Sequence, residues 1–368
     1  MRKDPVIYVF SGHTGGHLFP ALSYSHYLRE HLTSSSLVFV TSSRAQEIFS
    51  PQTFESFSGT HFLKPFPYPS GVLSKISFFA GLFQACLAVF SFYKKRRPDL
   101  VVGFGSYVSF PGVFVAKFMG IPTLIHEQNK VSGKATRWLL PYANKVAYSF
   151  PGTFCEQTSK YVESGLPLRS EMYGNVRDKS SGGAYNSRKH LLIIGGSQGA
   201  HALNEACLEV FSHLNSEEKE KIAVTHITGK QDFERIKTFY QEQKMIANVH
   251  PFFSDMKSVY LQTDFAISRA GANTFFELRH YQIPSLLIPY PYAGAHQMDN
   301  AIVGQNEGWA SVVKESDLNE KIVREFVQDG ISSASRINEM KTKAQQFSNQ
   351  DARTKLLELT KVLLRSHD

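Results

Sequence analysis

Residues 6–17 read VIYVFSGHTGGH, in which the apolar run Val6–Phe10 enters a glycine-rich turn and then a helical pattern near Pro20. A short apolar strand, a tight turn and a helix form the repeating unit of parallel α/β sheets. The chain restarts this unit where Leu191–Ile194 enters the turn Gly195–Ala200 and a helix predicted from His201. Further predicted strands lie at 37–41, 100–102, 122–125, 222–227, 264–267 and 285–289.

The two restarts indicate two similar domains. A chain of 368 residues is long for one domain and comfortable for two. We therefore predict an α/β fold with two Rossmann-like domains, each built on a parallel sheet. The stretch 177–188, RDKSSGGAYNSR, is the best linker or surface-loop candidate because it is rich in Ser and Gly. The final helix is predicted at about 353–366.

Composition narrows the class of protein. Hydrophobic residues make up 42% of the chain and the net charge is +8, which is typical of a globular, basic protein. There is no long Lys/Arg tract and no zinc-ligand spacing, so we expect no nucleic-acid partner. Three widely spaced cysteines, Cys86, Cys155 and Cys207, favour free thiols in a reducing compartment. The N-terminus lacks the long apolar region of a signal peptide, and we expect a cytosolic protein.

An uncharged apolar segment covers residues 76–93. It contains Ser77, Gly81, Gln84 and Ser91, whereas a membrane span needs about 20 strongly apolar residues, so spanning is not expected. A core helix is the simplest interpretation. However, both faces of the helix are apolar: Ile76, Phe79, Phe83 and Phe90 on one, and Phe78, Leu82, Val89 and Phe92 on the other. Our hypothesis is that one face packs on the sheet and the other contacts lipid, with Lys75 and residues 94–97 meeting anionic headgroups.

Glycine-rich turns after predicted strands indicate phosphate handling, because backbone amides and a helix N-terminus together attract anions. The most specific turn lies in residues 268–277, SRAGANTFFE. Gly271 permits close backbone approach, a helix from residue 273 or 274 would point at a diphosphate, and Glu277 could accept ribose hydroxyl groups. Thr274 and Glu277 fit a capping box equally well, and a capping box needs no ligand.

Three polar groups follow other strands. His17 suits a general base for a sugar hydroxyl, although it could instead cap the helix. Residues 126–129, HEQN, are dense in polar groups at a strand end, where ligands bind in such sheets. His296, Gln297 and Asn300 could bind sugar hydroxyls, or form only a loop and a helix cap.

Taken in order, segments 12–21, 103–112, 126–129, 195–200, 268–272 and 296–301 resemble the motifs of the MurG family of glycosyltransferases. The resemblance spans nearly the whole chain. It implies the GT-B architecture of two Rossmann-like domains facing a cleft. Domain 1–166 would face the acceptor and the membrane, with helix 350–368 packing back on it, and domain 167–349 would bind UDP-GlcNAc. The implied reaction moves GlcNAc, with inversion, to the C4 hydroxyl of MurNAc in lipid I (undecaprenyl-diphospho-MurNAc-pentapeptide), giving lipid II.

The same resemblance assigns roles to single residues. His17 would be the catalytic base. Acceptor contacts would come from Thr14, Gly15, Gly16, His17 and Asn129. Donor contacts would come from Arg169, Gly196, Ser197, Gln198, Phe253, Ala270, Gly271, Ala272, Glu277 and Gln297. No Asp-x-Asp motif is present, so we expect no obligatory metal and no cofactor. The partners would be UDP-GlcNAc, lipid I and an anionic membrane surface, at the cytoplasmic side of the bacterial inner membrane.

Three alternatives stay open. A related GT-B transferase could use a different lipid acceptor, such as a diacylglycerol. A UDP-GlcNAc 2-epimerase-like isomerase shares the architecture, but it needs carboxylates and arginines placed to act on C2. A non-catalytic sensor would bind UDP-GlcNAc and release no UDP with any acceptor.

Overall fold

The computed structural model describes residues 4–65, 72–155, 158–173, 188–196, 199–292, 296–347 and 351–365, with the backbone alone for 72–74. The chain forms two compact units: Met1–Ser170 together with Gln350–Asp368, and Glu171–Asn349. The first boundary lies close to the one expected after residue 166. Most of the linker candidate, 177–187, falls outside the described residues.

The first unit contains a parallel sheet whose strand order is β3-β2-β1-β4-β5-β6-β7. The strands are β1 (Val6–Ser11), β2 (Ser36–Ser42), β3 (Gly59–Leu63), β4 (Leu100–Phe104), β5 (Thr123–Glu127), β6 (Lys145–Tyr148) and β7 (Tyr161–Glu163). The order reverses between β1 and β4. At such a switch point the turns after neighbouring strands diverge, and ligands bind at the carboxyl ends of the strands.

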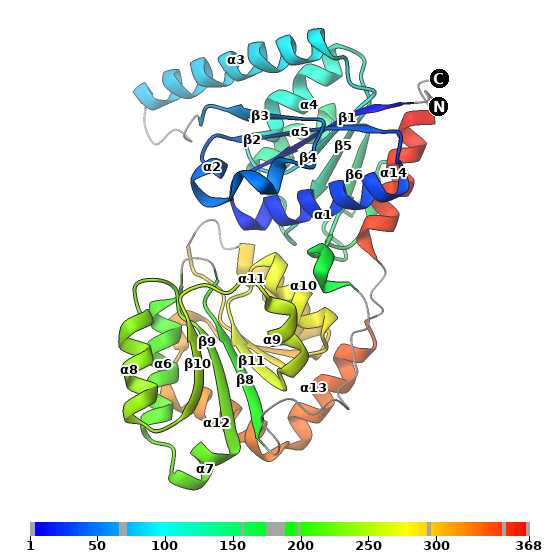
Figure 1. Ribbon diagram of the computed structural model, residues 1–368. Coiled ribbons are helices and arrows are strands. Elements are labelled where there is room, and N and C mark those ends of the chain that lie inside the picture. The colour runs from blue at the N-terminus through cyan, green and yellow to red at the C-terminus, as the bar shows by residue number, and fades with distance from the viewer. Residues whose placement is uncertain are drawn as a thin grey trace. The chain divides into compact units, whose positions relative to one another are not determined.

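Helices cover both faces of this sheet (Figure 1). They are α1 (Gly15–His31), α2 (Ala45–Ile48), α3 (Val72–Lys95), α4 (Ser109–Phe118), α5 (Lys134–Leu139) and α14 (Ala352–Arg365), with 3-10 turns at Pro51–Phe54 and Leu140–Tyr142. Because successive strand residues point to opposite faces, Ile7 and Val9 pack with α1 and α14, whereas Tyr8 and Phe10 pack with α3 and α4. The last helix, α14, therefore completes the core of the first unit.

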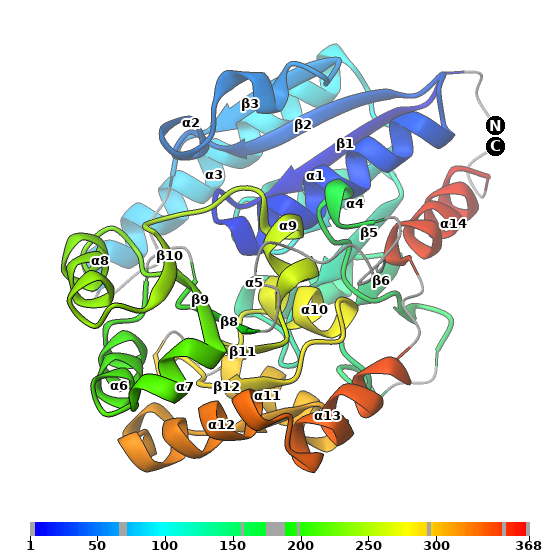
Figure 2. The same cartoon turned by 60° about the horizontal axis from the view of Figure 1, so that its bottom comes forward.

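The second unit repeats the plan with strand order β10-β9-β8-β11-β12-β13, again parallel. Its strands are β8 (Lys189–Ile194), β9 (Ile222–Ile227), β10 (Ile246–His250), β11 (Phe265–Ser268), β12 (Ser285–Leu287) and β13 (Ala310–Val312). Its helices are α6 (His201–Ser212), α7 (Ser216–Lys221), α8 (Phe233–Glu242), α9 (Met256–Gln262), α10 (Ala272–His280), α11 (His296–Asn306), α12 (Glu320–Ser332) and α13 (Ser335–Gln345), with 3-10 turns at Ser170–Met172 and Glu315–Asp317. Helices α6 and α12 cover one face, and α9 and α10 the other (Figures 1 and 2). The switch point lies between β8 and β11.

The predicted fold class is confirmed: both units are parallel α/β sheets. The sequence analysis missed β3, β6, β7, β10 and β13. Four of these are edge strands, which lack the continuous apolar runs of buried ones, and β6, next to the edge strand β7, is only four residues long. Helix α1 begins at Gly15 instead of near Pro20. Pro20 lies inside the helix, where its missing N–H removes one backbone hydrogen bond without ending the helix.

Helix α3 is apolar on both sides, as the sequence indicated. Phe78, Ala85, Val89 and Tyr93 are buried, whereas Ile76, Phe79, Phe83, Leu87 and Phe90 are 42–68% exposed. Among the described residues, α3 is the one helix that length and composition would allow to cross a membrane, and 22% of its apolar window is buried. The core helix of a soluble protein passes the same test.

Candidate functional site

The switch point of the first sheet brings the turns after β1 and β4 together around His17. A Cβ atom on Gly12 would lie 2.8 Å from Cβ of Ser106, and one on Gly105 would lie 3.0 Å from Nδ1 of His17 and from Oε1 of Gln128. Gly105 also has φ +61°, a conformation that L side chains rarely adopt. Glycine is therefore required where the backbone of one turn touches the imidazole of the other.

The first turn of α1 carries the residues expected to meet the acceptor. Thr14 is the N-cap residue, and its carbonyl accepts hydrogen bonds from the amides of His17 (3.0 Å) and Leu18 (2.9 Å). Thr14 and Gly16 are exposed. A helix N-terminus that is open to solvent and free of a side-chain cap suits an anion such as a diphosphate.

The environment of His17 favours its neutral form. Burial lowers the pKa of His17, and the charge of Glu127 together with hydrogen bonds involving Gln128 and the Phe104 carbonyl opposes this shift without cancelling it. A His that is neutral at pH 7 can accept a proton. The structure thus gives His17 the protonation state that a general base needs.

In the turn after β5, Glu127 holds the backbone. Its side chain is 2% exposed and accepts hydrogen bonds from the amides of Asn129 and Gly133, both at 3.0 Å. Asn129 itself is partly exposed on the same turn. The carboxylate therefore positions the loop that presents Asn129, and its charge also acts on His17.

In the second unit, the turn after β11 is braced by residues of α11. Oε1 of Gln297 accepts hydrogen bonds from the amides of Ala270 (3.2 Å) and Tyr290 (3.0 Å), and Nδ2 of Asn300 donates to the carbonyl of Ala270 (3.2 Å). Nε2 of Gln297 lies 3.9 Å from where a Cβ on Gly271 would stand. Because its oxygen is already engaged, Gln297 can offer a sugar only its N–H groups.

The capping-box interpretation of Thr274 and Glu277 is wrong. Helix α10 begins at Ala272 with Gly271 as N-cap, so Glu277 lies in the second turn and not at the third position. Glu277 is 5% exposed, and one of its carboxylate oxygens accepts a hydrogen bond from the Tyr260 hydroxyl at 2.8 Å. This bond orients the carboxylate that the sequence analysis assigned to the ribose.

The turn after β8 packs tightly against the turn after β9. A Cβ on Gly199, whose φ is +82°, would lie 2.5 Å from the carbonyl oxygen of Thr228. Gly196 also has a positive φ, +86°. Ser197 and Gln198, which were assigned to the donor, lie outside the described residues.

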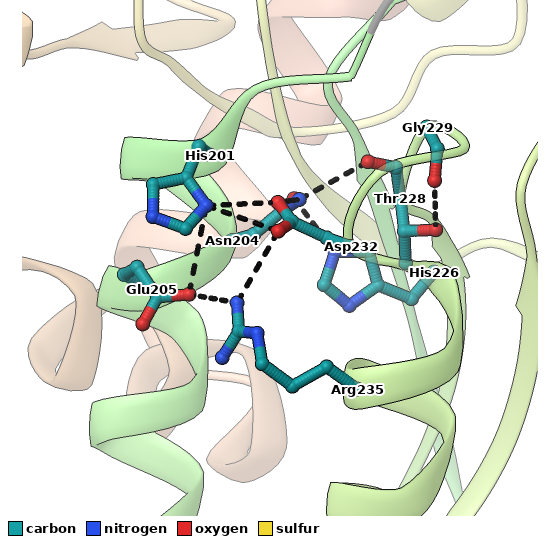
Figure 3. Close-up of polar contacts among 8 residues, drawn as sticks. All are labelled: His201, Asn204, Glu205, His226, Thr228, Gly229, Asp232 and Arg235. Atoms are coloured by element: carbon teal, nitrogen blue, oxygen red, sulfur yellow. Dashed lines mark hydrogen bonds and ion pairs between the residues drawn. The ribbon is translucent and has the colours of Figure 1, made fainter.

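A polar network on α6 and the β9–α8 loop fixes this contact (Figure 3). Nδ2 of Asn204 donates to Asp232 (2.8 Å) and to the carbonyl of Thr228 (3.1 Å), and its Oδ1 lies 3.0 Å from Nε2 of His226. Burial works to raise the pKa of Asp232, but hydrogen bonds from Asn204 and His201 outweigh it and lower that pKa. Burial lowers the pKa of His226 to about 3. The network therefore contains a carboxylate and a neutral imidazole.

Two further residues that the sequence analysis assigned to the donor lie on other elements. Arg169 belongs to the first unit, where its guanidinium lies 5.4 Å from the ring centroid of Phe19. Phe253 follows β10 and packs against His250 with ring centroids 4.5 Å apart. The structure gathers Ala270, Gly271, Ala272 and Gln297 at one turn, while Glu277 lies one turn further along α10.

Comparison with known proteins gives matches over both units. Residues 7–148 match the glycosyltransferase family 28 N-terminal domain, and residues 190–356 match the family 28 C-terminal domain. A protein of Methylococcus capsulatus named UDP-N-acetylglucosamine--N-acetylmuramyl-(pentapeptide) pyrophosphoryl-undecaprenol N-acetylglucosamine transferase is 34% identical over 356 residues, covering 94% of this chain and 95% of that one. A Brucella abortus protein with the same name is 31% identical and covers 99% and 95%.

The chain belongs to the MurG family. The crystal structure of MurG from Acinetobacter baumannii superposes with a TM-score of 0.76 at 26% identity, covering 96% of this chain and 99% of that one. The predicted GT-B fold and the predicted family are both confirmed, and the chain is an N-acetylglucosaminyltransferase.

Sequence reasoning missed the Asn204–Asp232–His226 network of this MurG-family chain. Residues 228–232, TGKQD, follow the strand β9 and are as dense in polar groups as other segments that were singled out. This local density of polar residues could have marked the stretch as a candidate site. What the sequence did not reveal is that Asn204, on another element, connects it to the turn after β8.

Proposed function

We propose that this protein transfers GlcNAc from UDP-GlcNAc to the C4 hydroxyl of MurNAc in lipid I and so forms lipid II for peptidoglycan synthesis. The observation that carries the proposal is near-complete coverage of relatives that bear this transferase name, at 31–34% identity. The acceptor motifs around His17 and the donor motifs around Gly271 both lie at switch points of their sheets, which supports the same assignment.

In the proposed mechanism, His17 takes the proton of the acceptor hydroxyl. The oxygen uses the released electron pair to form a bond to the anomeric carbon of the α-linked donor, on the face opposite to UDP. The bond between that carbon and the phosphate oxygen breaks, and its electrons leave with UDP. The new linkage is β. A positioned base contributes about 10²–10⁴-fold in rate.

The leaving diphosphate carries the charge that the second unit must stabilise. The start of α10, with Gly271 as its N-cap, presents backbone amides without a side-chain cap. Amides of this kind stabilise developing negative charge without reorganisation. Among the residues that the structure describes, no group of three or more His, Cys, Asp or Glu side chains could hold a metal ion.

We also propose that the protein binds the cytoplasmic side of the inner membrane through α3. Its exposed stripe, defined as Ile76, Phe79, Phe83, Leu87 and Phe90, is flanked by exposed Lys75 at one end and Lys94 and Lys95 at the other. Burying one large apolar side chain contributes about 1.5–3 kcal/mol, and each Lys or Arg near an anionic surface about 1 kcal/mol. Peripheral attachment through these side chains holds the enzyme at the membrane surface, where its proposed lipid-linked acceptor lies.

The test is UDP release from UDP-GlcNAc with and without a lipid I analogue, together with the mass of the product. Release that depends on the acceptor, and a product heavier by one GlcNAc, would establish the transferase. A diacylglycerol acceptor tests the related transferase. Conversion of UDP-GlcNAc to its C2 epimer without an acceptor would indicate the isomerase, and binding without any turnover would indicate a sensor.

A further inference from the structure

A series of buried polar side chains, joined by hydrogen bonds, begins next to His17. His126, on β5, is fully buried, and its Nε2 lies 3.0 Å from the carbonyl oxygen of Gly165. A carbonyl can only accept, so Nε2 of His126 carries the hydrogen. Burial lowers the pKa of His126 to about 4, so the ring is neutral and its Nδ1 is a bare acceptor.

Gln128 connects this ring to His17. Its Nε2 lies 3.2 Å from Nδ1 of His126 and donates to the His126 carbonyl at 3.0 Å. Both contacts are with acceptors, so the amide nitrogen must face His126 and the amide oxygen must face His17. Oε1 of Gln128 lies 3.0 Å from Nδ1 of His17. Because Oε1 can only accept, Nδ1 of His17 carries the hydrogen, and its Nε2 holds the lone pair.

The packing prevents the side-chain amide of Gln128 from flipping. Gln128 is 2% exposed. Rotating its amide by half a turn would bring its oxygen against two acceptors, the carbonyl and Nδ1 of His126, and its nitrogen against the N–H of His17. Gly105 leaves no room beside the amide oxygen and the His17 ring, since an added Cβ would lie 3.0 Å from both. A buried network in which every group is satisfied holds one orientation.

We propose that Gln128 and His126 are positioning residues that fix the tautomer of His17 and so decide that Nε2 receives the acceptor's proton. This inference rests on the proposed function, in which His17 is the base. When the hydroxyl proton moves to Nε2, Nδ1 keeps its hydrogen and the ring becomes a cation. Oε1 of Gln128 then accepts a charge-assisted hydrogen bond, which is stronger than the neutral one that it replaces.

The first test reads the tautomer directly and needs no substrate. Long-range ¹H–¹⁵N spectra of the full-length protein with ¹⁵N-labelled histidine distinguish the two neutral tautomers, and His17→Gln identifies the His17 signals among those of the 14 histidines. We expect the Nδ1–H form of His17 in the natural protein, and a shift towards the Nε2–H form in Gln128→Met. An Nε2–H form in the natural protein, or no change in Gln128→Met, would overturn the proposal.

The second test measures catalysis. Gln128→Met should lower kcat on the order of 10–10²-fold, below the roughly 10⁴-fold loss that follows when the orienting carboxylate of a serine-protease triad is replaced. The KM for UDP-GlcNAc should not change. Gln128→Glu keeps the size of the side chain and places a carboxylate beside Nδ1 of His17. The negative charge stabilises the protonated ring, so the acidic limb of the kcat profile should move to higher pH. Glu127, His13 and His126 are the other titratable groups that interact electrostatically with His17, and all three are unaltered in this variant.

A matched control removes a polar contact at the other end of β5. Oδ1 of Asn144 accepts hydrogen bonds from the amide and the hydroxyl of Thr123 (3.0 and 2.9 Å). Asn144→Leu should lower stability while the His17 tautomer and the pH profile stay unchanged. Full kcat in Gln128→Met would refute positioning by Gln128. Full kcat in His17→Ala would instead refute the base assignment in the proposed function, whatever the tautomer.

Discussion

Replacing Gly105 with alanine tests how closely the turn after β4 must approach His17. Two costs add at this position. An L residue at φ +61° costs about 1–2 kcal/mol. The new Cβ would lie 3.0 Å from Nδ1 of His17 and from Oε1 of Gln128, and overpacking of this kind costs about 1–3 kcal/mol. We expect Gly105→Ala to lose about 2–5 kcal/mol of unfolding free energy and to displace the imidazole.

Gly120 provides the matched control. It lies in the same unit with φ +67°, but a Cβ there would meet nothing within 4 Å. Gly120→Ala should therefore lose only the backbone cost, about 1–2 kcal/mol, and keep kcat. Urea unfolding gives the stabilities, and acceptor-dependent UDP release gives kcat. The reasoning would be refuted if the two variants lost equal stability and both kept full activity.

Four further predictions follow from the site and the surface. His17→Ala should lower kcat about 10²–10⁴-fold and leave UDP binding by calorimetry intact; equal loss of UDP affinity would mark His17 as structural. Folded His126 and His226 have pKa values of about 4 and about 3, below the unfolded value of about 6.5, so the unfolded chain binds more protons as pH falls. Stability should therefore decrease from pH 6.5 towards pH 4, by up to about 1.4 kcal/mol per pH unit for each ring, and a flat urea-stability profile would contradict this. Phe79→Ser with Phe83→Ser should weaken binding to anionic vesicles at least tenfold in sedimentation while kcat on a soluble acceptor stays unchanged, and unaltered sedimentation would eliminate α3 as the attachment face. EDTA should leave turnover unchanged, and activity that is lost with EDTA and restored by a divalent metal would disprove the metal-free mechanism.

The elements that carry the site could be predicted because their patterns are local. The apolar run Val6–Phe10 followed by glycines, and its repeat at Leu191–Ile194, specify buried strands and tight turns within about a dozen residues each. The structure extends these strands by one or two residues and keeps the turns where the patterns end them. A strand that is buried on both faces must be apolar throughout, which is what makes it visible in a single sequence.

The contacts that tune the site could not be predicted because they join distant segments. His17 and Gln128 are 111 residues apart in the chain, and nothing local to either residue encodes their hydrogen bond. The same holds for Asn204 and Asp232, which are 28 residues apart. For Glu277 a local pattern was misleading. The spacing of Thr274 and Glu277 suggested a capping box, but the helix begins earlier, with Gly271 as its N-cap, and the Glu277 carboxylate accepts a hydrogen bond from Tyr260 instead.

The two units share one backbone feature, a glycine at a close contact between two turns, and use it in two different sites. In each sheet the strand order reverses, and a glycine beside the switch point lets one turn touch its neighbour: Gly105 against His17, and Gly199 against the Thr228 carbonyl. In the first unit the group held by this contact is an imidazole with a lowered pKa, which suits a proton acceptor. In the second unit the contact holds the turn after β8 against the turn after β9, and Asn204 of α6 donates a hydrogen bond to the same Thr228 carbonyl. In the proposed reaction the attacking hydroxyl loses a proton and the departing diphosphate gains charge. In that proposal a side-chain base in the first unit and the backbone amides at the start of α10 in the second meet these two demands separately, so each site can be altered by mutation without removing the other.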